Sequence, residues 1–258
     1  MASQAKKIPL IGPAGSFVAR IIRRAGRKLR GKDGSGRDFY TFKRQSLNAG
    51  DNVQTQQVLN LLNYTKTSGS IYNGQDFPAG YHSINVTGLK LQGQRNLEER
   101  YARIPVDFTG KTVIDMGCNQ GGMLFAIADK IKSGTGVDFD SRVVNAANKI
   151  RSYSNNNHLE FYTFNMITED LDLLRDFIPA EKVDVAFLLA VCCYLPNWRD
   201  VIDMTTKIAS NLLFESNGTV EEQQEQMEYL KTRYSSVQLL SSDSDDRHVR
   251  NLYWCGHA

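Results

Sequence analysis

Residues 113–122, VIDMGCNQGG, decide the fold, because an apolar run passes there into a glycine-rich turn. A helix-like stretch, Gly121–Ile131, follows the turn, and a second apolar run, Thr135–Phe139, follows the helix. Such a strand, turn and helix form a cradle for a nucleotide, because the glycines let the backbone approach a ligand that lies at the helix N-terminus. The stretch therefore predicts a parallel sheet with a nucleoside site at the carboxyl ends of its strands.

Apolar runs and helix-like stretches alternate through the rest of the chain. Besides Thr112–Met116 and Thr135–Phe139, strands are predicted at Leu159–Phe164, Val183–Leu189, Asn211–Glu215, Val237–Leu240 and Val249–Cys255. Further helices are predicted at residues 53–64, Ser141–Arg151, Asp200–Ser210 and Thr219–Arg233. This alternation predicts an α/β fold with a doubly wound, mostly parallel sheet in residues 111–258, preceded by a helical and looped cap over 51–110.

Composition is that of a globular protein, with 41% hydrophobic and 23% charged residues in a chain of 258. No apolar run reaches the roughly 18 residues that a membrane span needs, and no secretory signal is visible at the N-terminus. The four cysteines, Cys118, Cys192, Cys193 and Cys255, are too few and too irregular for a disulfide scaffold. We therefore expect buried free thiols and a cytoplasmic protein.

Charge is concentrated in the first 50 residues, which form a predicted basic extension. Residues 1–37 hold ten basic residues and one acid, so the whole-chain charge of +3 leaves −6 for the remainder. Residues 16–30 predict an amphipathic helix with a basic face. Three interpretations are open: contact with an anionic membrane at the inner face, docking on the chain's own domain, and binding of RNA, which the acidic body makes the least favoured.

The spacing within the turn distinguishes two cofactor classes. A nicotinamide dinucleotide requires Gly-x-Gly-x-x-Gly against a pyrophosphate, whereas this chain has Gly117 and Gly121 separated by three residues, with Asp115 just before them. A carboxylate there would repel a pyrophosphate and suits a ligand with a sulfonium or ammonium group. Asp138 ends the second strand and is placed to accept hydrogen bonds from ribose hydroxyls.

DMGCNQGG resembles motif I of class I S-adenosylmethionine-dependent methyltransferases, acid-x-Gly-x-Gly-x-Gly. The resemblance implies a seven-stranded sheet whose last strand is antiparallel, with S-adenosyl-L-methionine as cofactor. Asn119 replaces the middle glycine, and asparagine tolerates a left-handed backbone well. The candidate cofactor-binding residues are Arg95, Asp115, Gly117, Cys118, Asn119, Gly121, Asp138, Phe139 and Asn165.

Residues 80–216 also resemble a bacterial methyltransferase subgroup that includes the tRNA wobble-uridine carboxymethyltransferases. The similarity rests on Tyr81–Ile84, Gly93–Arg95 and the stretch from Ile104 to Lys111. Cys193-Tyr194 stands where that tRNA family commonly has Tyr-His.

Three residues are candidates for catalysis or acceptor binding. Methyl transfer from a sulfonium chiefly requires alignment, and a hydroxyl acceptor also needs a base. His82 has a suitable ordinary pKa, which predicts turnover rising through roughly pH 6–7; Glu215 and Tyr194 lie at strand ends on the ligand side. His82 and Glu215 each also have a structural interpretation, and no metal-binding group of residues is expected.

The sequence thus predicts a methyltransferase that acts on a hydroxyl of a sugar, glycan or other small polar molecule. A tRNA-modifying methyltransferase and a non-catalytic cofactor-binding module are the alternatives.

Overall fold

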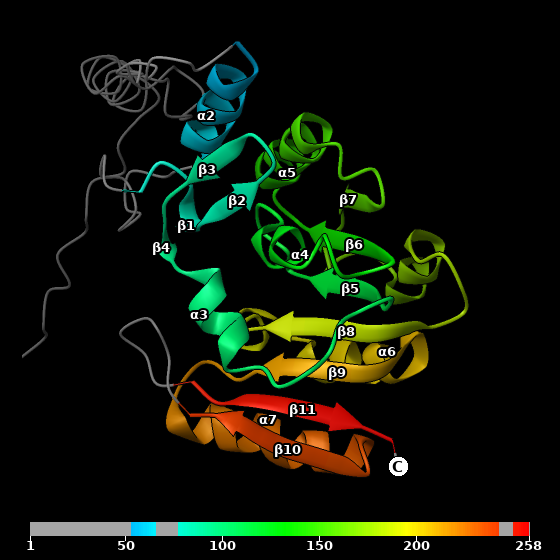
Figure 1. Cartoon of the computed structure of the whole chain (residues 1–258). Coiled ribbons are helices and arrows are strands. Elements are labelled where there is room, and N and C mark those ends of the chain that lie inside the picture. The colour runs from blue at the N-terminus through cyan, green and yellow to red at the C-terminus, as the bar shows by residue number, and fades with distance from the viewer. Residues whose placement is uncertain (1–52, 66–76, 243–249, 258) are drawn as a thin grey trace, which may run out of the picture. The chain divides into compact units, whose positions relative to one another are not determined.

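The structure is a computed structural model that describes residues 53–65, 77–242 and 250–257, all within the unit Leu47–Ala258 (Figure 1). The predicted basic extension, with its amphipathic helix over residues 16–30, lies outside the described residues. Among the described helices, none has the length and apolarity needed to cross a membrane.

Seven strands form the central sheet, in the order β10-β11-β9-β8-β5-β6-β7. Their bounds are β5 Thr112–Met116, β6 Ser133–Asp138, β7 Leu159–Thr163, β8 Val183–Leu189, β9 Ala209–Glu215, β10 Ser236–Ser241 and β11 Leu252–Gly256. Strands β5 to β9 pair in parallel, and β11 runs antiparallel to both of its neighbours. The predicted α/β fold class, with its seven-stranded sheet and antiparallel last strand, is confirmed.

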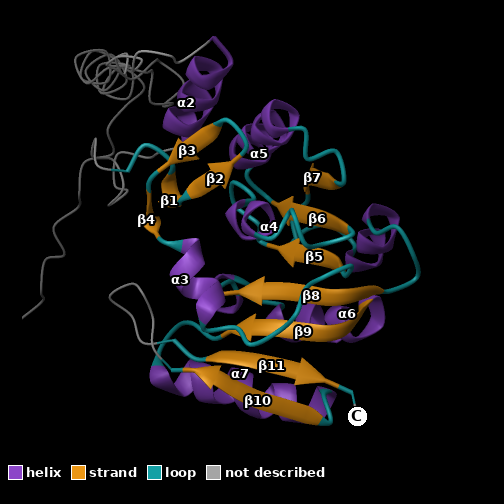
Figure 2. Cartoon of the chain, in the orientation of Figure 1, coloured by secondary structure: helices purple, strands orange, loops and turns teal. Residues whose placement is uncertain are grey.

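Helices cover both faces of the sheet (Figure 2). They are α2 Val53–Thr65, α3 Leu97–Ala102, α4 Gly122–Ala126, α5 Ser141–Ser154, α6 Trp198–Ile208 and α7 Val220–Arg233, with short 3₁₀ turns η1 Leu171–Phe177 and η2 Cys192–Tyr194. Apolar residues of α2, α4 and α5 join the core on one face, and those of α6 and α7 join the core on the other.

Successive residues of one central strand face these two cores in turn. Val113 belongs to the core of α4 and α5, whereas its neighbours Ile114 and Met116 belong to the core of α6 and α7. All three are fully buried or nearly so, and complete burial of such a side chain is worth about 1.5–3 kcal/mol. Burial on both faces explains why the strands read as continuous apolar runs rather than as alternating ones.

Several predicted helix boundaries are wrong, among them the end of α5, which runs to Ser154 rather than Arg151, and two ends that the sheet determines. The helix after the glycine turn ends at Ala126 rather than Ile131, because the chain must turn back beside β5, where Gly110 N–H donates to Lys130 O at 2.9 Å. Helix α6 ends at Ile208, and Ala209 already pairs with Val183 as the first residue of β9. In both cases the sheet register, which involves distant residues, sets the boundary.

The predicted helical and looped cap also contains four short strands that sequence patterns did not reveal. They are β1 Gly80–His82, β2 Ile84–Val86, β3 Leu89–Leu91 and β4 Gly93–Arg95. β1 pairs in parallel with β4, while β2 and β3 form a hairpin. Strands of three residues are too short to show a two-residue alternation, so their existence depends on pairing within the cap.

We expect Gly121→Ala to destabilise the protein more than Gly110→Ala does. Both glycines have positive φ, 76° and 72°, so alanine at either position should lower the free energy of unfolding by about 1–2 kcal/mol. A Cβ at Gly121 would also lie 2.5 Å from the Phe161 ring, whereas at Gly110 it would meet nothing within 4 Å. This overlap should add about 1–3 kcal/mol to the loss of unfolding free energy in Gly121→Ala. Urea unfolding midpoints of the two variants measure the difference. Equal losses would contradict the packing role of Gly121.

Candidate active site

A cleft of about 480 Å³ opens at the carboxyl ends of β5, β6, β8 and β9. The sheet side contributes the glycine turn and the strand ends, and the cap contributes residues of β1, β4 and α3. Nine predicted site residues line the cleft: His82, Arg95, Asp115, Gly117, Cys118, Asn119, Asp138, Tyr194 and Glu215. Three do not line it: Gly121, Phe139 and Asn165.

The glycine turn is built on a left-handed backbone. Gly117, Asn119 and Gly121 have φ values of 90°, 51° and 76°. Backbone N–H groups of Gly117 and Cys118 both donate to Val137 O, at 2.8 and 3.0 Å, which ties the turn to β6. The sequence-based expectation that Asn119 adopts a left-handed conformation is therefore confirmed, and its side chain stabilises the turn by accepting from Gln120 N–H at 2.8 Å.

Asp138 connects this turn to the end of β6. Its Oδ2 accepts from the backbone N–H of Asn119 at 2.9 Å, and its Oδ1 accepts from that of Asp140 at 3.0 Å. Each carboxylate oxygen has two lone pairs, so both can still accept from neighbouring hydroxyls of a ligand. Burial raises the pKa of Asp138, partly offset by these two hydrogen bonds.

Asp115 lies deeper in the cleft and is 2% exposed. Its Oδ2 has no hydrogen-bond partner among the described residues. Burial raises the pKa of Asp115 to about 7, with the carboxylate of Asp138 adding to the effect and Arg100 opposing it. A buried carboxyl of this kind is stabilised in its charged form by a cation that enters the cleft.

The three predicted residues outside the cleft wall have other surroundings. Gly121 is the N-cap of α4 and lies against Phe161. Phe139 follows Asp138 and is 73% exposed. Asn165 caps a local turn, because its side chain accepts from Ile167 N–H at 3.0 Å.

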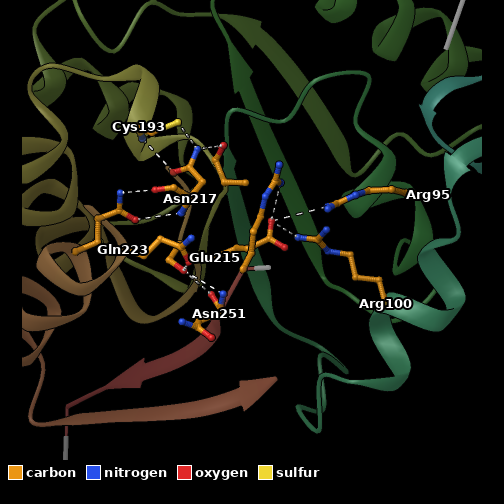
Figure 3. A network of polar contacts seen from close by, with 11 residues as sticks. Arg95, Arg100, Cys193, Glu215, Asn217, Gln223 and Asn251 are labelled. Atoms are coloured by element: carbon orange, nitrogen blue, oxygen red, sulfur yellow. Dashed lines mark hydrogen bonds and ion pairs between the residues drawn. The ribbon is translucent and has the colours of Figure 1, made fainter. Parts of the chain in front are cut away.

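Glu215 is the centre of an ion-pair network (Figure 3). Its Oε2 lies 2.9 Å from Arg100 and 3.8 Å from both Arg95 and Arg250. The candidate base of the sequence analysis is thus engaged by three guanidinium groups. Sequence reasoning missed Arg100 and Arg250, since Arg100 and Glu215 are 115 positions apart and no local pattern connects them.

His82 is buried in the cap wall, and neither ring nitrogen has a hydrogen-bond partner among the described residues. Its ring lies over the start of α4, where a Cβ at Gly122 would be 2.6 Å from the His82 Cβ. Burial lowers the pKa of His82 well below its usual range, and the charges of Arg100 and Arg95 lower it further. His82 is therefore neutral at pH 7, and its titration lies below the expected pH 6–7.

The wall formed by the loop after β8 combines an exposed side chain with a strained backbone. Tyr194 is 71% exposed, and Ala190 has a φ of 57°. Asn217 Nδ2 donates to Ala190 O at 2.7 Å and fixes that loop. The thiol of Cys193, which also accepts from Asn217 Nδ2, is exposed; the prediction of burial is wrong for this cysteine, because η2 turns it outward.

Among the described residues, no group of three or more His, Cys, Asp or Glu side chains is arranged to hold a metal ion.

Comparison with known proteins indicates the class of reaction. Residues 114–211 match a protein family described as a methyltransferase domain. No curated protein is significantly similar to this chain. A structure of the bifunctional kinase-methyltransferase WbdD is similar with a TM-score of 0.55 and 15% identity, over 77% of this chain and 46% of WbdD. This chain therefore corresponds to less than half of that protein.

The N-terminal domain of EvdMO1 with SAH (S-adenosylhomocysteine) bound is similar with a TM-score of 0.54 and 10% identity, over 69% of this chain and 91% of that domain. At such identities the likeness to solved structures shows the fold alone. The methyltransferase-domain match, the fold and the SAH-bound neighbour together indicate S-adenosylmethionine as the cofactor.

The side chains of the cleft also fit this cofactor, independently of the comparisons. The buried Asp115 Oδ2 has no described partner, which suits the cationic part of S-adenosylmethionine, and the two oxygens of Asp138 suit neighbouring ribose hydroxyls. The left-handed turn exposes backbone beside them without a bulky side chain.

S-adenosylmethionine should bind more tightly as the pH rises through about 7. The Asp115 carboxyl must lose its proton before it attracts a cation, and below its pKa the affinity falls by up to about tenfold per pH unit. Asp115→Asn should bind at least about tenfold more weakly at high pH and lose this dependence. Calorimetry across the range measures both. Asp107→Asn, an exposed acid outside the cleft, is the matched control; an unchanged pH profile in Asp115→Asn would reject the assignment.

Proposed function

We propose that this protein is an S-adenosylmethionine-dependent methyltransferase that methylates a hydroxyl group of a sugar, glycan or other small polar acceptor. The observation that carries the proposal is His82. It is a buried imidazole, neutral at pH 7, with both nitrogens unpartnered among the described residues, in the wall of the cleft that holds Asp115 and Asp138. A neutral imidazole in such a place can accept the proton of a hydroxyl acceptor.

The cofactor residues hold one reactant in place. When bound, S-adenosylmethionine supplies a methyl group activated by a sulfonium. Asp115 attracts the cationic portion, Asp138 accepts from ribose hydroxyls, and the backbone from Gly117 to Asn119 lines the floor of the cleft. By the resemblance to class I methyltransferases, the half-buried Asn165 would contact the adenine. Fixing both reactants in one orientation is worth about 7–11 kcal/mol of the barrier in favourable cases.

His82 performs the proton chemistry in this proposal. One ring nitrogen accepts the hydroxyl proton as the acceptor oxygen attacks. The low pKa keeps the imidazole unprotonated near neutral pH, although it also makes the ring a weaker base. Arg100 and Arg95 disfavour the protonated ring, so the proton is released to solvent once the product departs. Glu215 is occupied by its three arginines, which makes it a positioning residue, and Tyr194 at the cleft edge is placed to contact the acceptor.

A sugar acceptor is consistent with one neighbour, because the EvdMO1 domain was also determined in the presence of SAH and D-fucose. The tRNA alternative has no described feature that favours it. Membrane contact through residues 16–30 and a cytoplasmic location stay predictions.

His82→Ala should lower the turnover number at saturating cofactor by at least about 100-fold, because general bases contribute about 10²–10⁴ in rate. Cofactor affinity should stay within about twofold of wild type. In the wild type, the turnover number should be nearly constant between about pH 6 and pH 8 and fall only at lower pH, since His82 titrates below its usual range. Initial rates of methyl transfer test both points. A wild-type rate in His82→Ala would show that His82 is not the base and has a structural role.

The acceptor class can be found with methyl-labelled S-adenosylmethionine and fractionated cell extract. Label is expected in the sugar, glycan or small-molecule fraction. Label in RNA would instead support the tRNA alternative, and cofactor binding with no labelled product in any fraction would support a non-catalytic module.

A further inference from the structure

The cleft is electrically polarised from one end to the other. At the ends of β5 and β6 its wall carries the carboxyl groups of Asp115 and Asp138. At the end of β9 and in the cap it carries three guanidinium groups, those of Arg95, Arg100 and Arg250, around the single carboxylate of Glu215. The first end suits a cation, which the cofactor provides. The second end suits an anion.

We infer that the methyl acceptor carries an oxyanion, a carboxylate or phosphate group, that binds at Arg95, Arg100 and Arg250. The inference rests on the proposed methyltransferase function and names its substrate class. Guanidinium groups bind both kinds of oxyanion through charge-assisted hydrogen bonds. An arginine has five N–H donors, so each of the three can serve such a group while it keeps its contact to Glu215 and its other contacts.

Glu215 makes the three guanidiniums converge. Arg95 comes from β4, Arg100 from α3 and Arg250 from the segment before β11, and all three meet at the Glu215 carboxylate. Arg95 and Arg100 are almost completely buried, at 1% and 7% exposure, so their positive ends are held in the wall rather than extended into solvent. Figure 3 shows both pointing at Glu215 from the cap side.

The position of the base points to the same substrate class. β1 and β4 pair in parallel with His82 directly opposite Arg95. The backbones of paired residues on adjacent strands lie about 5 Å apart, both side chains line the cleft, and the charge of Arg95 acts on the His82 ring. In this inference, an acceptor held by its anion at Arg95 presents a hydroxyl toward His82. A sugar acid or a sugar phosphate has this combination of groups.

The cofactor's own carboxylate is the main competitor for the same arginines. That carboxylate is bonded to the carbon that bears the ammonium group, and we place the cationic end at Asp115 on β5. Glu215 is on β9, two strands away, which is about 10 Å in the sheet. Arg100 acts on Asp115 as well as on Glu215 and can therefore also serve the cofactor's carboxylate, so the Arg250→Gln variant decides between the acceptor and the cofactor.

Calorimetry on the full-length protein saturated with SAH tests the inference, with glucuronate and glucose 1-phosphate as anionic probes and glucose as the neutral one. We expect at least one anionic probe to bind at least about tenfold more tightly than glucose. Which of the two binds distinguishes a carboxylate from a phosphate acceptor. Arg250→Gln should weaken that probe by at least about tenfold and leave SAH affinity within about twofold.

Two further variants distinguish the loss of the Arg250 charge from a general loss of folding. Arg250→Lys keeps the charge and should recover part of the probe affinity, while Arg175→Gln, an exposed arginine on η1 outside the cleft wall, should change nothing. Equal binding of glucose and both anionic probes would overturn the inference. So would an Arg250→Gln protein that loses SAH affinity but keeps probe affinity, because the arginines would then serve the cofactor. Failure of the wild type to bind SAH at all would instead reject the proposed function.

Discussion

The site depends on one buried carboxylate. Glu215 lies at the end of a central strand and joins guanidinium groups from three other segments, two of them in the cap. Without it, three cations would be gathered in a largely buried wall and would lose the carboxylate that they share. Breaking a buried pair by removing one partner typically costs about 3–5 kcal/mol. The network therefore keeps the cap over the strand ends, and with it the cleft.

Burial raises the pKa of the acids in the cleft and lowers the pKa of the base. Loss of water disfavours the charged form of any group, so the pKa of Asp115 rises to about 7 and that of His82 falls. Each result suits the proposed chemistry: Asp115 regains its charge when a cation arrives, and His82 is unprotonated and able to accept a proton. The arginines of the Glu215 network act on both groups, so cofactor site and base are electrostatically linked.

Of the three described non-glycine residues with left-handed φ, two lie in the same region, and the third, Asn155, caps α5. Asn119 in the glycine turn and Ala190 after β8 are non-glycine residues with left-handed φ, and both line the cleft. Such conformations cost of order 1–3 kcal/mol each and persist only where the surroundings hold them. Here Asp138 and Asn217 do so, by accepting from Asn119 N–H and by donating to Ala190 O.

The sequence by itself determined the sheet and the cofactor end of the site. Continuous apolar runs and a glycine turn are local signals. The turn fixes where Asp115 and Asp138 lie, because Asp115 precedes the last residue of β5 and Asp138 ends the adjacent parallel strand β6. Only the tertiary structure decided the rest: the three-residue strands of the cap, the pairing of Arg100 with Glu215 across 115 positions, the outward thiol of Cys193 and the low pKa of His82. Each of these depends on burial or on a partner far along the chain, and neither is encoded in the spacing of neighbouring residues.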